Sequence, residues 1–165
     1  MSKEPPNELF MPPNTLKSKV GGTVQGLDTE AVKRAEQAME ELKIEFSDWI
    51  AKDIKHLGDA YDAFVSDRSA ARASSLFRAS HDLKGQATTF EYPLIARVAS
   101  SLAKLMDELG SHDKIPMALV QAHVDAIQVI HRDKIKDISD LTALTLAEEL
   151  EKKVLKALAH ASQKA

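Results

Sequence analysis

Apolar residues recur every three or four positions along most of this chain, which is the spacing of one face of an α-helix. A first helix is predicted from a cap at Asp28 or Thr29 to beyond residue 50. Gly58 either interrupts this helix, so that residues 60–65 form a second short one, or lies within it. The apolar positions over its first half are Val32, Ala35, Met39, Leu42, Phe46, Trp49 and Ile50.

Four further helices follow a polar break at residues 67–69. Proline suits the first turn of a helix, glycine commonly ends one, and serine or aspartate caps one. These signals place the helices at about 69–90, Pro93 to Gly110, Pro116 to about 133, and Ser139 or Asp140 to about 161. No segment alternates with the period of a strand. We therefore predict an all-α fold, an antiparallel four-helix-type bundle with an additional C-terminal helix.

Prolines and glycines gather before the first helix. They are Pro5, Pro6, Pro12, Pro13, Gly21, Gly22 and Gly26. This composition predicts a flexible N-terminal tail over residues 1–27 and one helical domain over residues 28–165. The length of 165 residues suits one domain with a sizeable core rather than two domains.

Composition narrows the classes of function. The formal net charge is −3, whereas general binding to nucleic acid needs clustered positive charge, so no nucleic-acid partner is expected. The chain has no cysteine, which excludes disulfides, thiolate catalysis and cysteine-bound metals. No run is long and apolar enough for a membrane span, and the start lacks the apolar core of a secretory signal. We expect a cytoplasmic monomer without a membrane partner.

The last helix carries an apolar stripe with charged residues opposite to it. Its members are Leu141, Leu144, Ala147 or Glu148, Leu150 or Glu151, Val154, Leu155 and Leu158. The stripe either packs on the bundle or forms a seam with a second copy, and packing is favoured because the stripe is short for a coiled coil.

The second helix places a histidine, a lysine and a glycine on one side of its interior. With His81 set at zero and about 100° per residue, a mostly apolar stripe lies opposite: Leu76, Ala79, Leu83, Gln86, Ala87 and Phe90. The residues on the side of His81 are Ser74, Phe77, Arg78, Lys84, Gly85 and Thr88. Because the apolar stripe must face the core, His81 is predicted to be exposed, and Gln86 is predicted near the buried face.

This exposed side suits chemistry performed on another molecule. An exposed imidazole is partly neutral, and therefore nucleophilic, at cellular pH. Lys84 lies one turn away and can offset the charge of an anion on His81, with Arg78 reinforcing the positive potential. Gly85 costs helix stability but allows another protein to approach closely, and Phe77 is a candidate anchor for that protein. One such surface lacks the pocket of an enzyme and instead forms half of an active site.

The segment Ala79-Ser80-His81-Asp82-Leu83-Lys84-Gly85-Gln86-Ala87 resembles the motif of histidine-containing phosphotransfer (HPt) domains, His-x-Leu-Lys-Gly followed by small residues. The resemblance covers about residues 41–132 and includes a helical bundle with the motif on an exposed helix. It departs from the family about ten residues after the histidine, where a second glycine is frequent and this chain has Glu91.

The resemblance implies a role for each matching residue. His81 would accept a phosphoryl group from a receiver-domain aspartate or a histidine kinase and pass it to another receiver aspartate. Lys84 would stabilise the phosphoryl charge, and Gly85 would keep the docking surface open, with Ser74, Phe77, Arg78 and Thr88 around it. The response-regulator receiver would contribute Mg²⁺ and the acidic pocket, so this chain is expected to bind no cofactor or metal.

Three other interpretations remain beside this phosphorelay carrier. The chain is alternatively a pseudo-HPt protein that docks receivers or kinases without carrying phosphate, or a purely structural bundle, which leaves an outward Gly85 unexplained. An enzyme is least favoured, because the sequence shows no set of residues that would form a catalytic pocket. No glycine-rich ATP loop is present either, so the chain is expected to carry a phosphoryl group but not to generate one. Ser80, His81 and Asp82 are adjacent on a helix and therefore cannot form a catalytic relay. His123 and His131 share one helix but lack the second half of a metal site.

Overall fold

The computed structural model describes residues 29–109 and 112–163, and the predicted tail over 1–27 lies outside them. Its chain forms two units, residues 1–40 and 41–165. Helix α2 is Thr29–Ser66, and the second unit continues with α3 (Ala70–Thr89), α4 (Pro93–Glu108), α5 (Met117–Arg132) and α6 (Leu141–Ser162). A short 3₁₀ helix, η1 (His112–Lys114), lies between α4 and α5.

Helix α2 passes through Gly58 without a break, so the continuous alternative is correct. A Cβ at Gly58 would lie 3.6 Å from Gln128 Nε2 of α5, which is ordinary contact, so this part of α2 runs beside α5. Its buried side chains, including Ile50, Leu57 and Phe64, belong to the common core. From residue 50 onward, the apolar residues of α2 therefore form the face that packs into the core.

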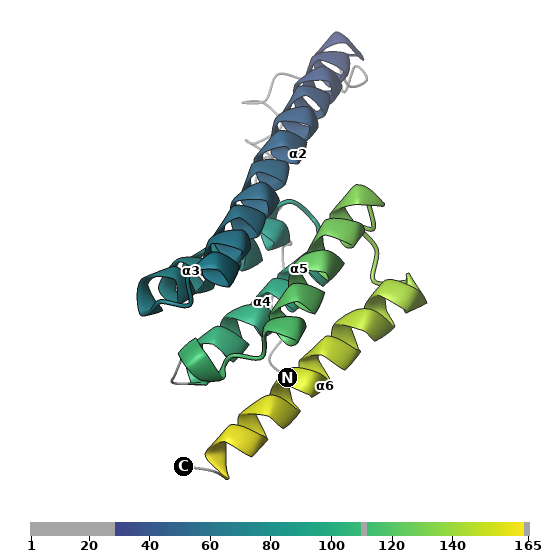
Figure 1. The fold of residues 1–165 in the computed structure, drawn as a ribbon. Helices are drawn as coiled ribbons and strands as arrows, with labels where there is room; N and C mark the ends of the chain where they lie inside the picture. Colours follow the sequence, from purple (N-terminus) through teal and green to yellow (C-terminus); the bar gives the residue numbers. More distant parts are fainter. Residues whose placement is uncertain (1–28, 110–111, 164–165) are drawn as a thin grey trace, which may run out of the picture. The chain divides into compact units, whose positions relative to one another are not determined.

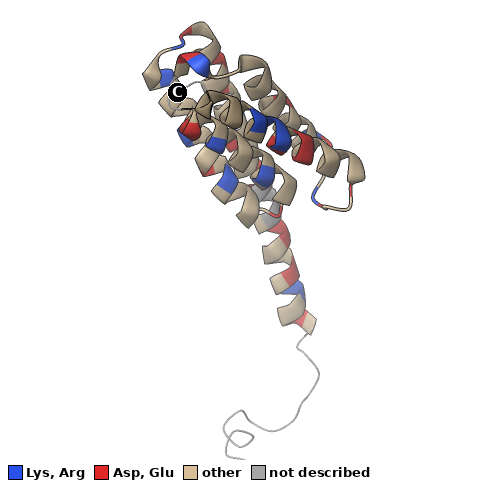
Figure 2. Ribbon diagram, turned by 90° about the horizontal axis from the view of Figure 1, so that it is seen from below, with Lys and Arg blue, Asp and Glu red and all other residues tan. Residues whose placement is uncertain are grey.

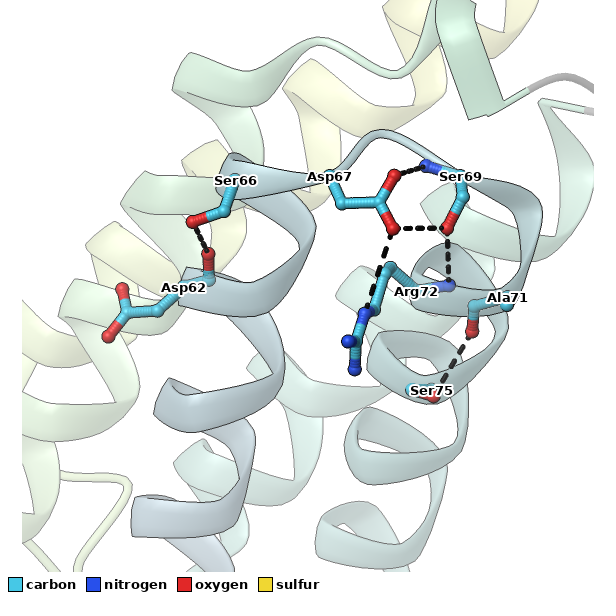
Figure 3. A network of polar contacts seen from close by, with 7 residues as sticks. All are labelled: Asp62, Ser66, Asp67, Ser69, Ala71, Arg72 and Ser75. Atoms are coloured by element: carbon cyan, nitrogen blue, oxygen red, sulfur yellow. Dashed lines mark hydrogen bonds and ion pairs between the residues drawn. The ribbon is translucent and has the colours of Figure 1, made fainter.

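The polar residues 67–69, predicted as a break between helices, form hydrogen bonds that fix the start of α3 (Figure 3). Ser69 caps the helix, because its Oγ accepts from the Arg72 backbone N–H at 3.4 Å. Asp67 in turn accepts from the Ser69 backbone N–H at 3.0 Å and from the Ser69 hydroxyl at 2.9 Å. Arg68 reaches across the bundle, where it donates to the carbonyls of His112 and Ile115 at 2.9 and 3.1 Å. These bonds hold the start of α3 next to η1.

The remaining helix boundaries agree with the caps and breakers of the sequence. Pro93 lies in the first turn of α4, and Asp140 caps α6 by accepting from the Ala143 backbone N–H at 2.9 Å. The predicted stop at Gly110 falls on a residue outside the described ranges. The described part of α4 ends at Glu108, with Leu109 as its C-cap.

Helix α6 packs on α4 and α5, and α4 also packs on α3 (Figure 1). The buried residues of α6 are Ala143, Ala147, Leu150 and Val154. Arg97 of α4 donates to both carboxylate oxygens of Glu151, with Nε–Oε1 at 3.0 Å and Nη2–Oε2 at 2.7 Å. The C-terminal stripe is thus a packing face, but Leu141 and Leu155 are exposed and were wrongly assigned to it.

The described residues form helices without strands, which confirms the predicted all-α bundle with an additional C-terminal helix. Basic and acidic residues are interspersed along its helices (Figure 2). Among the described helices, none combines the length and apolar character that a membrane crossing requires.

Candidate functional site

Helix α3 has a buried side and an exposed side, as the projection of the sequence predicts. Leu76, Ala79, Leu83 and Ala87 are buried, whereas 64% of the His81 side-chain surface is exposed. Ser80 is also fully buried, and its hydroxyl is satisfied there by donating to the Leu76 carbonyl one turn before at 2.8 Å. The packing of α3 therefore presents His81 to solvent.

Gln86 was predicted near the buried face, and this was wrong, because Gln86 is exposed. The inner face at that level is occupied by Leu83 and Ala87, which are fully buried. These two residues are one turn apart and suffice to cover the core there. The polar Gln86 beside them keeps its amide in water, which avoids the cost of burying an unpaired polar group.

The imidazole of His81 has two neighbours on its own helix. Its Nδ1 lies 3.9 Å from Asp82 Oδ1, and its ring centroid lies 6.0 Å from that of Phe77. Since 3.9 Å is too long for a hydrogen bond and Ser80 is turned inward, no Ser-His-Asp relay exists. The Asp82 carboxylate nonetheless lies on the Nδ1 side of the ring. Nε2 is therefore the ring nitrogen that faces away from this negative charge.

Lys84 and Gly85 lie on the exposed side one turn after His81. Within the described part of the chain, Lys84 forms no ion pair that would hold its ammonium away from an incoming anion. A Cβ built on Gly85 meets no atom within 4 Å. Packing within this chain therefore does not require glycine at this position.

The other predicted site residues extend this surface along α3. Ser74, Arg78 and Thr88 are exposed and Phe77 is half-buried. The Thr88 hydroxyl donates to the Lys84 carbonyl at 3.1 Å, so it is already engaged within the helix. Ser74 and Phe77 line a groove of about 270 Å³ that also involves Met106, Asp107 and Ile115. The surface around His81 thus continues into a depression near η1.

Sequence reasoning missed one neighbour of this surface, Asp53 of α2. Partial burial raises the pKa of the Asp53 carboxyl, the nearby His56 lowers it, and the charge of Asp82 raises it further. Asp53 and Asp82 therefore interact across the α2–α3 contact. No local motif could reveal this pair, because the two residues lie on different helices and far apart in the sequence.

The turn at the C-terminal end of α3 explains how this chain has Glu91 where a second glycine is frequent in the family. Glu91 has a φ of 62°, the left-handed conformation that favours glycine. The Tyr92 N–H bonds to the Ala87 carbonyl at 2.8 Å and the Glu91 N–H to that of Thr88 at 3.4 Å, which is a Schellman turn. The turn thus keeps its geometry without glycine.

Of the remaining histidines, His123 is fully buried, and His56 and His160 are exposed. No group of three or more potential metal ligands occurs in the residues that the structure describes. His81 is thus an exposed imidazole on α3 with Lys84 one turn away, and the described bundle around it is all-helical.

These features place an exposed histidine, a lysine and a glycine on one side of a helix in an all-helical bundle. The family model described as Hpt domain matches residues 41–164, and the chain belongs to the Hpt-domain family. The resemblance found in the sequence extended only to about residue 132. The family model matches further along the chain and includes α6. Neither a curated protein nor a solved structure matches the chain. Hpt domains carry phosphoryl groups in two-component signalling and interact there with receiver domains and kinases.

Proposed function

We propose that this chain is a phosphorelay carrier in which His81 is the phosphoacceptor. The observation that carries the proposal is the exposure of the His81 ring on a face that also presents Lys84 and Gly85. The chain receives its phosphoryl group from a response-regulator receiver or a histidine kinase and returns it to a receiver aspartate. Mg²⁺ and the acidic pocket belong to the receiver.

In the transfer step, the Nε2 lone pair of His81 attacks the phosphorus of the aspartyl phosphate. The bond between phosphorus and the aspartate oxygen breaks, the aspartate leaves as a carboxylate, and the N–P bond forms. The proton of the imidazole stays on Nδ1, on the side of the ring where Asp82 Oδ1 lies 3.9 Å away. Attack by a carboxylate oxygen of a second receiver aspartate reverses these bond changes: a new bond between phosphorus and oxygen forms, the N–P bond breaks, and its electron pair returns to Nε2.

Lys84 and Gly85 support this step in different ways. The Lys84 ammonium offsets the charge of the phosphoryl oxygens as they pass between the two proteins, and it keeps this role in both directions. Gly85 leaves open space beside the reacting nitrogen, so the receiver loop can approach α3 closely. A rigid helix suits this reaction, because alignment supplies most of the catalytic effect.

The test is transfer of a radioactive phosphoryl group from a receiver domain loaded with a small phosphodonor. Label is expected on the wild-type chain, and none on His81→Gln. His56→Gln is the matched control, because His56 is also an exposed histidine of the bundle. Label on the chain should be stable in base and labile in acid, as an N–P bond is. Label that persists in His81→Gln would overturn the assignment.

Binding measured in the same mixtures separates the proposed carrier from a docking protein. A wild-type chain that binds the receiver but never accepts label would support the pseudo-HPt alternative and contradict our proposal. Lys84→Gln should keep binding and slow transfer at least about tenfold, since one charge-stabilising donor is lost. Gly85→Gln should fold normally and weaken binding, because a long side chain would occupy the open space beside His81.

A further inference from the structure

The groove near η1 continues the surface around His81. It has a volume of about 270 Å³ and lies between α3, the C-terminal end of α4 and η1. Phe77 belongs to both features, because its ring centroid lies 6.0 Å from that of His81 and its side chain also lines the groove. Ser74, another lining residue, precedes His81 by two helical turns, which is about 10 Å along the helix axis. The groove therefore begins beside the reactive ring.

A protein that reaches His81 should also cover this groove. A specific interface buries about 800 Å² on each partner, and a circular patch of that area has a radius of about 16 Å. A patch centred on His81 thus extends past Phe77 and Ser74 and includes the groove between α3 and α4.

The floor of the groove is apolar and is held in place by the chain itself. Ile115 is buried, and Phe77 and Met106 are half-buried. Arg68 donates to the carbonyls of His112 and Ile115 at 2.9 and 3.1 Å, which anchors the side of the groove that η1 forms. A side chain that binds there therefore has to order little of this chain, which lowers the cost of binding.

Asp107 of α4 supplies the carboxylate of the groove. This carboxylate is exposed, and within the described ranges it forms no hydrogen bond or ion pair. Its acidic neighbours differ in this respect. Glu108 Oε1 lies 3.8 Å from Lys104 Nζ, and Asp113 Oδ1 lies 3.6 Å from His112 Nε2. No lysine or arginine of the described chain lines the groove, which is therefore apolar with one unpaired carboxylate.

We propose that this groove binds a lysine or arginine side chain of the receiver that docks on His81, so that Asp107 is a specificity-determining residue of the phosphotransfer. Lysine and arginine both carry an apolar stem and a charged end. The stem fits the floor at Phe77 and Met106, and the charged end reaches the Asp107 carboxylate. A receiver with an acidic residue at this place is disfavoured, because two like charges then meet. This inference rests on the proposed function, which brings the receiver to His81.

The first test is the dependence of phosphotransfer on receiver concentration at low salt, with the receiver domain that loads the wild-type chain fastest. Asp107→Lys should raise the KM for this receiver about tenfold, because it places a like charge against the basic side chain. The rate at saturating receiver should stay unchanged, since Asp107 contacts the partner and not the phosphoryl group. Asp107→Asn should raise the KM less and should make the KM less dependent on salt.

Glu108→Lys is the matched control for Asp107→Lys. It makes the same charge change at the next residue, and Glu108 does not line the groove, so its KM should stay close to that of the wild type. Circular dichroism and urea unfolding check that both variants are folded. A KM that is unchanged in Asp107→Lys, or raised equally in both variants, would overturn the inference.

The second test identifies the side chain on the receiver by charge reversal. Each surface lysine or arginine of the receiver is replaced in turn by glutamate and assayed with the wild-type chain and with Asp107→Lys. One substitution should slow transfer to the wild type and restore transfer to Asp107→Lys, as expected for two residues in direct contact. Restoration by none of them would refute the basic side chain. Absence of label on the wild-type chain from every receiver would instead overturn the proposed function, so the two failures are distinguishable.

Discussion

His123 Nε2 of α5 lies 3.1 Å from Ser101 Oγ of α4, in the interior of the bundle. The His123 Nδ1 lies 2.7 Å from the Leu119 carbonyl, which can only accept, so Nδ1 carries the proton and Nε2 accepts from the serine hydroxyl. Burial lowers the pKa of His123, although the bond to Leu119 opposes the shift. The neutral ring is therefore a part of the folded core.

Acid should destabilise the fold through His123. Its folded pKa lies below the unfolded value of about 6.5. Below 6.5 the unfolded chain binds a proton that the folded chain does not, so stability is full above this pH and falls as pH drops towards the folded pKa. Urea unfolding between about pH 7.5 and pH 5.5 should show this loss.

His123→Gln should be less stable at neutral pH but should depend less on pH across this range. His160→Gln, at an exposed position, serves as the control. An unchanged pH slope in His123→Gln would contradict the assignment. His131 is also partly buried with a lowered pKa, so some pH dependence should remain in the variant.

Glu91→Gly should stabilise the chain. The Glu91 φ of 62° is costly for a residue with a Cβ, and glycine removes that cost at the price of a more flexible unfolded chain. The expected gain in free energy of unfolding is about 0.5–1 kcal/mol, measured by urea denaturation. Lys134→Gly offers a matched comparison, because Lys134 has a φ of 53° in an equivalent turn after α5. A loss of stability in both variants would refute this account of the turns.

The bidentate pair of Arg97 and Glu151 should contribute to the attachment of α6 to α4. Both side chains are about one-third exposed, 37% and 35%, so solvent screens their attraction. A double-mutant cycle with Arg97→Gln and Glu151→Gln should give a coupling free energy of about 0.5–1 kcal/mol. The coupling should shrink in high salt. A coupling of zero at low salt would show that apolar packing alone holds α6.

Gly85→Ala should raise the free energy of unfolding by about 0.5–1 kcal/mol, because alanine favours the helix and its Cβ meets no atom. Thermal or urea unfolding measures the gain. Arg78→Ala at the same exposed face is a control for surface change alone, because arginine and alanine have similar helix propensities. No gain for Gly85→Ala would mean that the folded chain itself uses the glycine.

The exposed side of α3 could be predicted because it rests on local periodicity. Leu76, Leu83 and Ala87 define the core side so clearly that His81 has to lie outside. Gln86 was misplaced because its angular position is near the edge of that side, where neighbouring side chains decide burial. The interactions of Asp53 with Asp82 and of His123 with Ser101 each join two helices, so they depend on tertiary packing that no local pattern contains.

Gly85 has a consequence for directed evolution of this protein. A library selected for heat resistance alone should accumulate alanine or longer helix-forming residues at position 85, since nothing in the folded chain opposes them. A library selected for signalling should discard the longer ones. Comparing the residues that survive at this single codon under the two selections would therefore separate what the fold needs from what the partner needs.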